Sequence, residues 1–141
     1  MNWYQTAILH SVAAKKNRKV LLVDLDGTIA TDAKYPAIGK PQDGVKEALQ
    51  KLKEAGYRIR VFTCRTNGEH WDDSSEADNE EYKQTLKDIE DYLDDNDIPY
   101  DDVVEWDEGK PFASWYVDNR ALNYDGDWDE VVKSILSKKD D

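Results

Sequence analysis

Cysteine is almost absent from this sequence: Cys64 is the only one among 141 residues. A single cysteine excludes an internal disulfide and is typical of a reducing compartment, so we expect a cytoplasmic protein. With one cysteine and two histidines, a zinc site is not expected either.

Long apolar runs are also missing, and no segment has the length and hydrophobicity of a transmembrane helix. The N-terminal residues lack the basic start of a secretory signal, and Gln5, Thr6, His10 and Ser11 interrupt their apolar stretch. We therefore expect neither a signal peptide nor a membrane partner.

Positive charge is scarce, because 19 Lys and Arg stand against 31 Asp and Glu and give a formal net charge of −12. Between Asp72 and Glu108 there are 17 acids and two lysines, so this segment carries −15 and the rest of the chain +3. The acidity is therefore regional. It argues against a nucleic-acid partner, since binding to nucleic acid depends on phosphate neutralisation by Lys and Arg.

Apolar strand-like runs alternate with amphipathic helical segments along the chain. Strands are expected at about 19–24, 57–63, 101–106 and 114–118, and helices at about 44–55, 76–95 and 127–138. This alternation predicts one domain over residues 1–141, with an α/β, three-layer, Rossmann-like architecture and a mostly parallel sheet. Residues 1–18 are an N-terminal extension in which a helix over 2–14 is a candidate dimer contact.

Details of the expected helices follow from their spacing and flanking residues. Asp43 is a candidate cap for the start of helix 44–55, and Gly56 is well placed to end it. The long acidic helix should bury the stripe that runs from Tyr82 to Leu93. The last helix should turn its apolar residues inward, namely Trp128, Val131, Val132, Ile135 and Leu136.

The predicted strands end in polar residues. Asp24 and Asp26 follow the first strand, Thr63 ends the second, and Asp118 ends the last, with Lys110 shortly before it. Because ligands bind at the carboxyl edge of such sheets, we expect these five residues to converge there. Two acids at the end of a buried strand cost free energy unless a cation or donor compensates them.

Three acids are a suitable oxygen ligand set for Mg²⁺. A calcium-binding EF-hand is a poorer interpretation, because its sixth loop position requires glycine. That position is Ile29 when counted from Asp24 and Glu130 when counted from Asp125.

The order of these motifs resembles that of the haloacid dehalogenase (HAD) superfamily, in its phosphatase branch. The run Asp-Leu-Asp-Gly-Thr at 24–28 is similar to the first motif of that family, and VFTCR, with Thr63, to the second. GKPFASWYVDN, with Lys110 and Asp118, resembles the third and fourth motifs. The four motifs cover about residues 19–123 in order, and the chain between them has room only for a short flap. The resemblance therefore implies a HAD-like domain with no sizeable cap.

The resemblance also implies a function, the Mg²⁺-dependent hydrolysis of a phosphate monoester through an aspartyl-phosphate intermediate. Asp24 would be the nucleophile, and Asp26 would act as general acid and then general base. Thr63 and Lys110 would be catalytic and would bind the phosphoryl group. Mg²⁺ would be held by Asp24, by the backbone carbonyl of Asp26 and by Asp118.

Arg65 is a candidate substrate-binding residue, because it can pair with a phosphate or carboxylate; the alternative is a structural salt bridge. Asn119 stands where members with a double-acid fourth motif carry a second acid, and we expect weaker Mg²⁺ binding from this change. A catalytically weak or inactive phospholigand-binding module is therefore one alternative function.

A second alternative is a nucleic-acid end phosphatase, since an uncapped site is open to macromolecules; the acidic helix argues against it. The expected partner is a phosphorylated small molecule, and a second subunit of a homo-oligomer is a candidate cover for the site.

Overall fold

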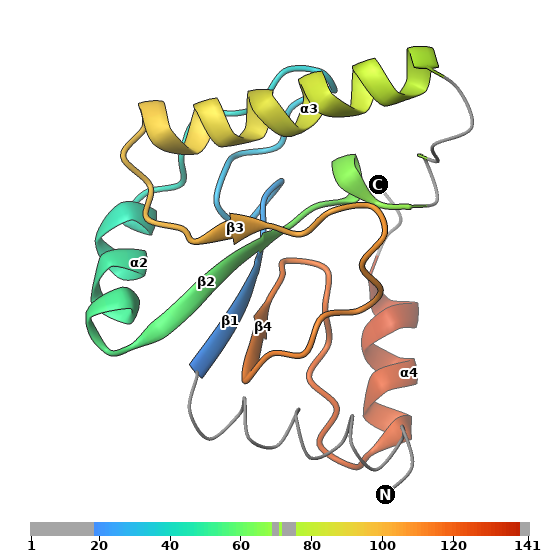
Figure 1. Cartoon of the computed structure of the whole chain (residues 1–141). Coiled ribbons are helices and arrows are strands. Elements are labelled where there is room, and N and C mark those ends of the chain that lie inside the picture. Colours follow the sequence, from blue (N-terminus) through green and yellow to red (C-terminus); the bar gives the residue numbers. More distant parts are fainter. Residues whose placement is uncertain (1–18, 69–70, 72–75, 139–141) are drawn as a thin grey trace, which may run out of the picture.

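The computed structural model of the chain (Figure 1) describes residues 19–68, 71 and 76–138. The elements are, in order, β1 (Lys19–Asp24), α2 (Val45–Glu54), β2 (Tyr57–Phe62), the 3₁₀ turn η1 (Cys64–Thr66), α3 (Glu76–Asp95), β3 (Asp102–Val103), β4 (Trp115–Val117) and α4 (Trp128–Ser137). The helix expected over 2–14 lies outside the described residues.

The strands form one four-stranded sheet in the order β3-β2-β1-β4, and all paired strands are parallel. Helices flank this sheet (Figure 1). The fold is therefore α/β and Rossmann-like, as the sequence predicted. Residues between β1 and α2 form a flap joined by single bridges, Asp26 with Ala30 and Ala30 with Pro41, and no sizeable cap domain is inserted there.

The core lies on both faces of β1. Leu21 and Val23 join Ile59 of β2 and the buried residues of α2 and α3 in one cluster. Val20 and Leu22, which alternate with them, pack against Val104 and Ala113 on the opposite face. A central parallel strand is buried on both sides, which explains its continuous apolar run.

The predicted strands are confirmed, although the segment expected at 101–106 is shortened to Asp102–Val103. The end of α2 is also as predicted, since Gly56 adopts φ +96° and its N–H donates to the carbonyl of Lys53. The expected cap by Asp43 is wrong. Gly44 takes the N-cap position with φ 80°, and no side chain caps this helix.

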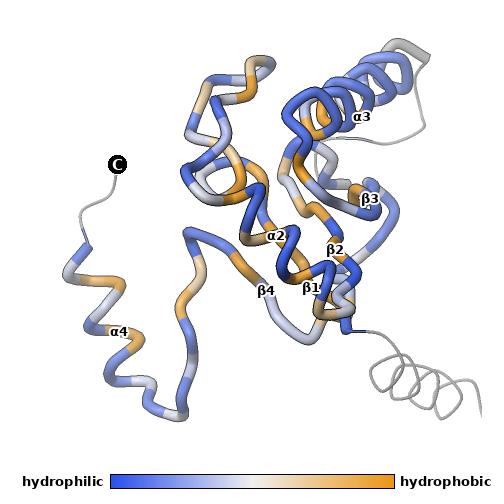
Figure 2. The backbone as a smooth tube through the Cα atoms, turned by 90° about the vertical axis from the view of Figure 1, so that its left-hand side faces the viewer, coloured by the Kyte–Doolittle hydropathy of each residue, from blue (hydrophilic) through white to orange (hydrophobic). Residues whose placement is uncertain are grey.

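The two C-terminal helices differ in burial. Tyr82, Ile89 and Leu93 of α3 are buried, as expected. The expected inward face of α4 is wrong: none of its residues is buried, and Trp128 is 67% and Leu136 80% exposed. Figures 1 and 2 show the reason, because the backbone of α4 stands apart from the sheet and from the other labelled helices.

None of the helices in the described part of the chain combines the length and the hydrophobicity needed to cross a membrane.

Two leucine-to-alanine substitutions test the difference in burial between α3 and α4. Leu93→Ala, at a fully buried position, should lower the free energy of unfolding by about 2–5 kcal/mol, because it leaves a cavity. Leu136→Ala is the matched control and should change it by less than about 0.5 kcal/mol. Denaturant titration of both variants measures these values. A loss at Leu136 as large as that at Leu93 would show that α4 is packed in solution.

Candidate active site

A tight turn follows β1 and sets the two acids apart. The Leu25 side chain is fully buried, and its backbone N–H donates to the carbonyl of Phe62, so pairing with β2 continues one residue past the strand. Gly27 then adopts φ +85°, where a Cβ would collide with the Asn119 side chain. The backbone conformation favours glycine here, and any larger residue would also have to displace the end of the Asn119 side chain.

Four of the five strand-end residues named from the sequence line one pocket of about 810 Å³. Asp24 ends β1, and Thr63 directly follows β2. Asp118 directly follows β4, and Lys110 lies in the loop before that strand. The fold therefore brings these side chains together at the carboxyl edge of the sheet. The lining of this pocket does not include Asp26 or Arg65.

The Asp24 carboxyl is partly buried, and its environment disfavours its charge. Burial raises its pKa from the ordinary value of 3.8 to about 6, and repulsion by the Asp118 carboxylate adds to this shift. The Thr28 hydroxyl opposes it by donating a hydrogen bond of 3.3 Å to Asp24 Oδ2. The pocket thus holds two mutually repelling carboxylates that a cation would stabilise.

The Thr28 hydroxyl also links the two strand ends. While it donates to Asp24, its oxygen accepts from the backbone N–H of Asn119 at 3.1 Å. This connection fixes the segment after β4 against the nucleophile candidate. From the sequence, Thr28 was expected only to help the chain turn away into the flap, and this bridging hydroxyl was missed; its position four residues after Asp24 was the available signal.

The other pocket residues differ in how firmly they are held. The Thr63 side chain is 2% exposed, and its oxygen accepts from the backbone N–H of Arg65 at 3.1 Å, at the start of η1. Asp118 Oδ1 accepts from the Arg120 N–H at 2.9 Å. The Lys110 side chain is exposed, and its ammonium lies 5.0 Å from the centre of the Tyr116 ring.

Asp26 pairs with Arg65 instead of lining the pocket. Arg65 Nε donates to Asp26 Oδ2 and an Arg65 terminal nitrogen donates to Oδ1, both at 2.9 Å. The Arg65 side chain is only 8% exposed. Of the two alternatives left open for Arg65, the structure contains the salt bridge.

The pocket offers a restricted set of metal ligands. In the ranges that the structure describes, no three His, Cys, Asp or Glu residues are grouped as a metal site. Asp24 and Asp118 are the strand-end carboxylates of this pocket, and they lie close enough that the Asp118 charge, after burial, contributes to the raised pKa of Asp24. Mg²⁺ prefers such donors, keeps several waters and commonly shares a substrate phosphate, so this donor set fits Mg²⁺.

Comparisons with known proteins identify a fold but no activity. No family model and no curated protein matches the chain. A crystal structure of a target protein from Vibrio cholerae is 26% identical with a TM-score of 0.50, over 86% of this chain and 99% of that one. A conserved protein from Bacteroides thetaiotaomicron is 21% identical with a TM-score of 0.48, over 88% and 94%. The similarity to the Vibrio cholerae protein supports the α/β fold.

The raised pKa of Asp24 predicts that this residue destabilises the metal-free protein at neutral pH. Its pKa is about 6 in the folded state against 3.8 ordinarily, so the unfolded chain loses this proton first as the pH rises. The free energy of unfolding therefore falls between about pH 4 and pH 6, and the loss is complete above that range.

Asp24→Asn removes the titration and should stabilise the protein at pH 7.5 in EDTA by about 1–2 kcal/mol, a figure reduced for partial exposure. The gain should shrink towards zero below about pH 4. Denaturant titrations across this pH range measure it, with the exposed Asp97→Asn as control. An Asp24→Asn variant that is no more stable than the parent protein at pH 7.5 would contradict this electrostatic account.

Proposed function

We propose that the chain is a Mg²⁺-dependent phosphomonoesterase of the HAD-like type, which forms an aspartyl-phosphate on Asp24. The observation that carries this proposal is the convergence of Asp24, Thr63, Lys110 and Asp118 on one pocket. They come from four separate segments and meet at the sheet edge where such folds bind ligands. A nucleophile, a hydroxyl, an ammonium and a second carboxylate are the groups that phosphoryl transfer needs.

The environment of Asp24 suits a nucleophile. Its carboxyl lies partly out of water and is held by the Thr28 hydroxyl. The Thr63 oxygen already accepts a backbone hydrogen bond, so its own proton can be donated to a phosphoryl oxygen. The Lys110 side chain can bring positive charge to the same phosphoryl group.

The charge of the pocket explains why a divalent cation belongs to this proposal. Its lining contains Asp24, Asp118, Glu105 and Glu108 against the single lining cation Lys110, and of these acids Glu108 is already paired with Arg60 behind the lining. Mg²⁺ held by Asp24, Asp118 and the Asp26 carbonyl would offset the repulsion between these acids and a phosphate dianion.

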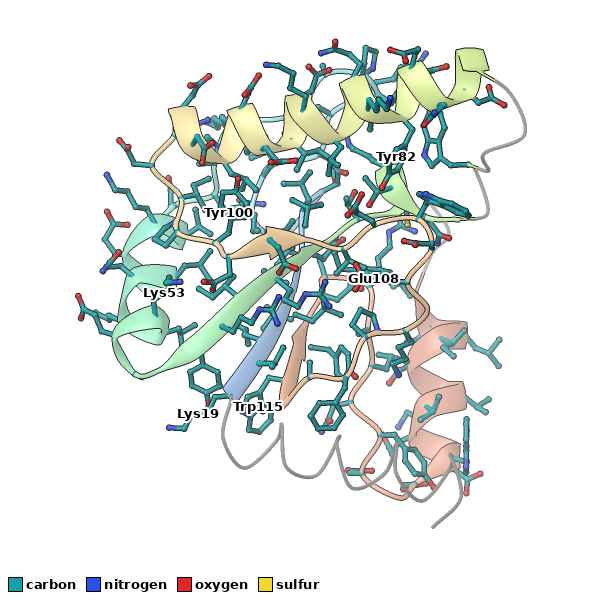
Figure 3. The ribbon with its side chains drawn as sticks, in the orientation of Figure 1. Lys19, Lys53, Tyr82, Tyr100, Glu108 and Trp115 are labelled. Atoms are coloured by element: carbon teal, nitrogen blue, oxygen red, sulfur yellow. The ribbon has the colours of Figure 1, made fainter. Side chains whose placement is uncertain are left out.

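The same charges favour a small substrate over nucleic acid. An acidic pocket rim repels a polyphosphate backbone, whereas one phosphate ester needs only the local cations. The walls also include exposed aromatic rings, Trp115 and Tyr116. Figure 3 shows Trp115 at the start of β4, well separated from Glu108, which also lines the pocket. A phosphorylated small molecule is therefore the proposed substrate class.

Hydrolysis of 4-nitrophenyl phosphate tests the function. Activity should require Mg²⁺, stop in excess EDTA, and fall by at least about 10³-fold in Asp24→Asn, because the amide cannot form the phosphoenzyme. Asp97→Asn, at an exposed turn, is the matched control and should retain activity.

Turnover that survives in Asp24→Asn would refute the nucleophile assignment. If no ester from a broad panel is hydrolysed but a phosphorylated ligand binds, the chain is a binding module. Much faster removal of phosphate from an oligonucleotide end than from sugar phosphates would favour the nucleic-acid alternative.

A further inference from the structure

The Arg65 guanidinium has almost no donor left for a substrate. Of its five N–H groups, two bind the Asp26 carboxylate. Two more donate to flap carbonyls, that of Pro36 at 3.2 Å and that of Ala37 at 2.7 Å. Bidentate recognition of a phosphate needs two free parallel donors, so this side chain is not arranged as a phosphate clamp.

Neighbouring elements hold Arg65 in this arrangement. Its guanidinium carbon lies 5.6 Å from the centre of the Tyr35 ring, and the Tyr35 hydroxyl contacts Glu81 at 3.2 Å and Thr85 at 3.0 Å, both on α3. The Trp71 indole N–H donates to the backbone carbonyl of Arg65 at 2.6 Å, which holds the backbone of this residue. The position of the guanidinium is therefore set by the fold and does not depend on a ligand.

We propose that Arg65 is a positioning residue, which fixes the Asp26 carboxyl and the flap for proton transfer and does not itself bind the substrate. The proposal rests on the function inferred above, because it concerns the acid-base residue of that reaction. Both Asp26 oxygens accept from Arg65, and each keeps a lone pair for other partners. A carboxyl held in this way keeps one orientation, and proton transfer depends steeply on orientation.

The reaction shows where the effect of Arg65 would be felt. An Asp24 oxygen attacks phosphorus, the ester P–O bond breaks with its electron pair on the leaving oxygen, and the Asp26 carboxyl gives that oxygen its proton. Water then attacks phosphorus and returns a proton to Asp26, while the P–O bond to Asp24 breaks and inorganic phosphate leaves. Arg65 acts only through Asp26. Its loss should therefore matter most where the leaving oxygen most needs a proton.

Two aryl phosphates of similar size distinguish this role from the others. The 4-nitrophenolate group leaves without protonation, whereas phenol is a poorer leaving group. Arg65→Met should reduce kcat/KM, which reports formation of the phosphoenzyme, at least about tenfold more for phenyl phosphate than for 4-nitrophenyl phosphate, since general acid catalysis contributes about 10²–10⁴-fold. KM should not rise for either ester, because Arg65 does not bind the substrate.

Asp26→Asn should give the same selective loss. The double variant should add little selectivity to either single one, because both substitutions interrupt one proton transfer. Arg65→Lys, which keeps the charge but not the paired donors, should fall between the parent protein and Arg65→Met. It also provides the test if thermal denaturation shows that Arg65→Met does not fold.

Arg60 offers a matched control on β2, the strand that precedes Arg65 in the chain. Its side chain is 14% exposed and pairs with Asp102 at 2.9 Å and with Glu108 at 2.8 Å, so Arg60→Met also breaks a partly buried ion pair. That variant should lose stability, but the ratio of its rates on the two esters should stay that of the parent protein.

Equal losses of kcat/KM on both esters in Arg65→Met, or a raised KM without selectivity, would overturn the positioning role while leaving the proposed function intact. A parent protein that hydrolyses neither ester would overturn both.

Discussion

Parallel pairing of β1 with β2 on one side and β4 on the other is the constraint on which the candidate site depends. The register aligns Asp24 with Phe62 and Val23 with Val117, so the residues that follow β2 and β4 emerge beside Asp24. The pairing is stabilised by the apolar run of β1, whose side chains are buried on both faces of the sheet. Chemistry at the strand ends is thus a consequence of packing along the strand.

The same arrangement lowers the stability of the protein at the candidate site. Burial of Leu25 draws the turn into the core and takes the adjoining Asp24 carboxyl partly out of water, next to Asp118. The resulting repulsion costs stability in the metal-free protein, and a cation bound between the two carboxylates would relieve it. The negative charge of Asp26 is compensated within the protein, because the Arg65 guanidinium binds that carboxylate directly.

Most of the sheet and much of the site could be predicted from sequence, because apolar runs locate strands and parallel strands share one carboxyl edge. Asp24, Thr63 and Asp118 were placed correctly by that logic. The spacing of the apolar residues in α4 predicted that they share one face of the helix. It did not predict whether another element packs against that face. The ion pair between Arg65 and Asp26 joins residues 39 positions apart in the sequence. The sequence alone does not show which of the many acidic residues binds a given arginine.

The central claim is that Asp24 becomes phosphorylated during turnover. Acid-quenched Asp26→Asn protein, taken while it turns over 4-nitrophenyl phosphate with Mg²⁺, allows the most direct measurement by peptide mass spectrometry. This ester needs no acid to leave, but hydrolysis of the intermediate lacks its base, so the phosphoenzyme should accumulate. The expected result is one phosphoryl group on the peptide that contains Asp24. Release of 4-nitrophenol with no phosphoryl group on that peptide would contradict it.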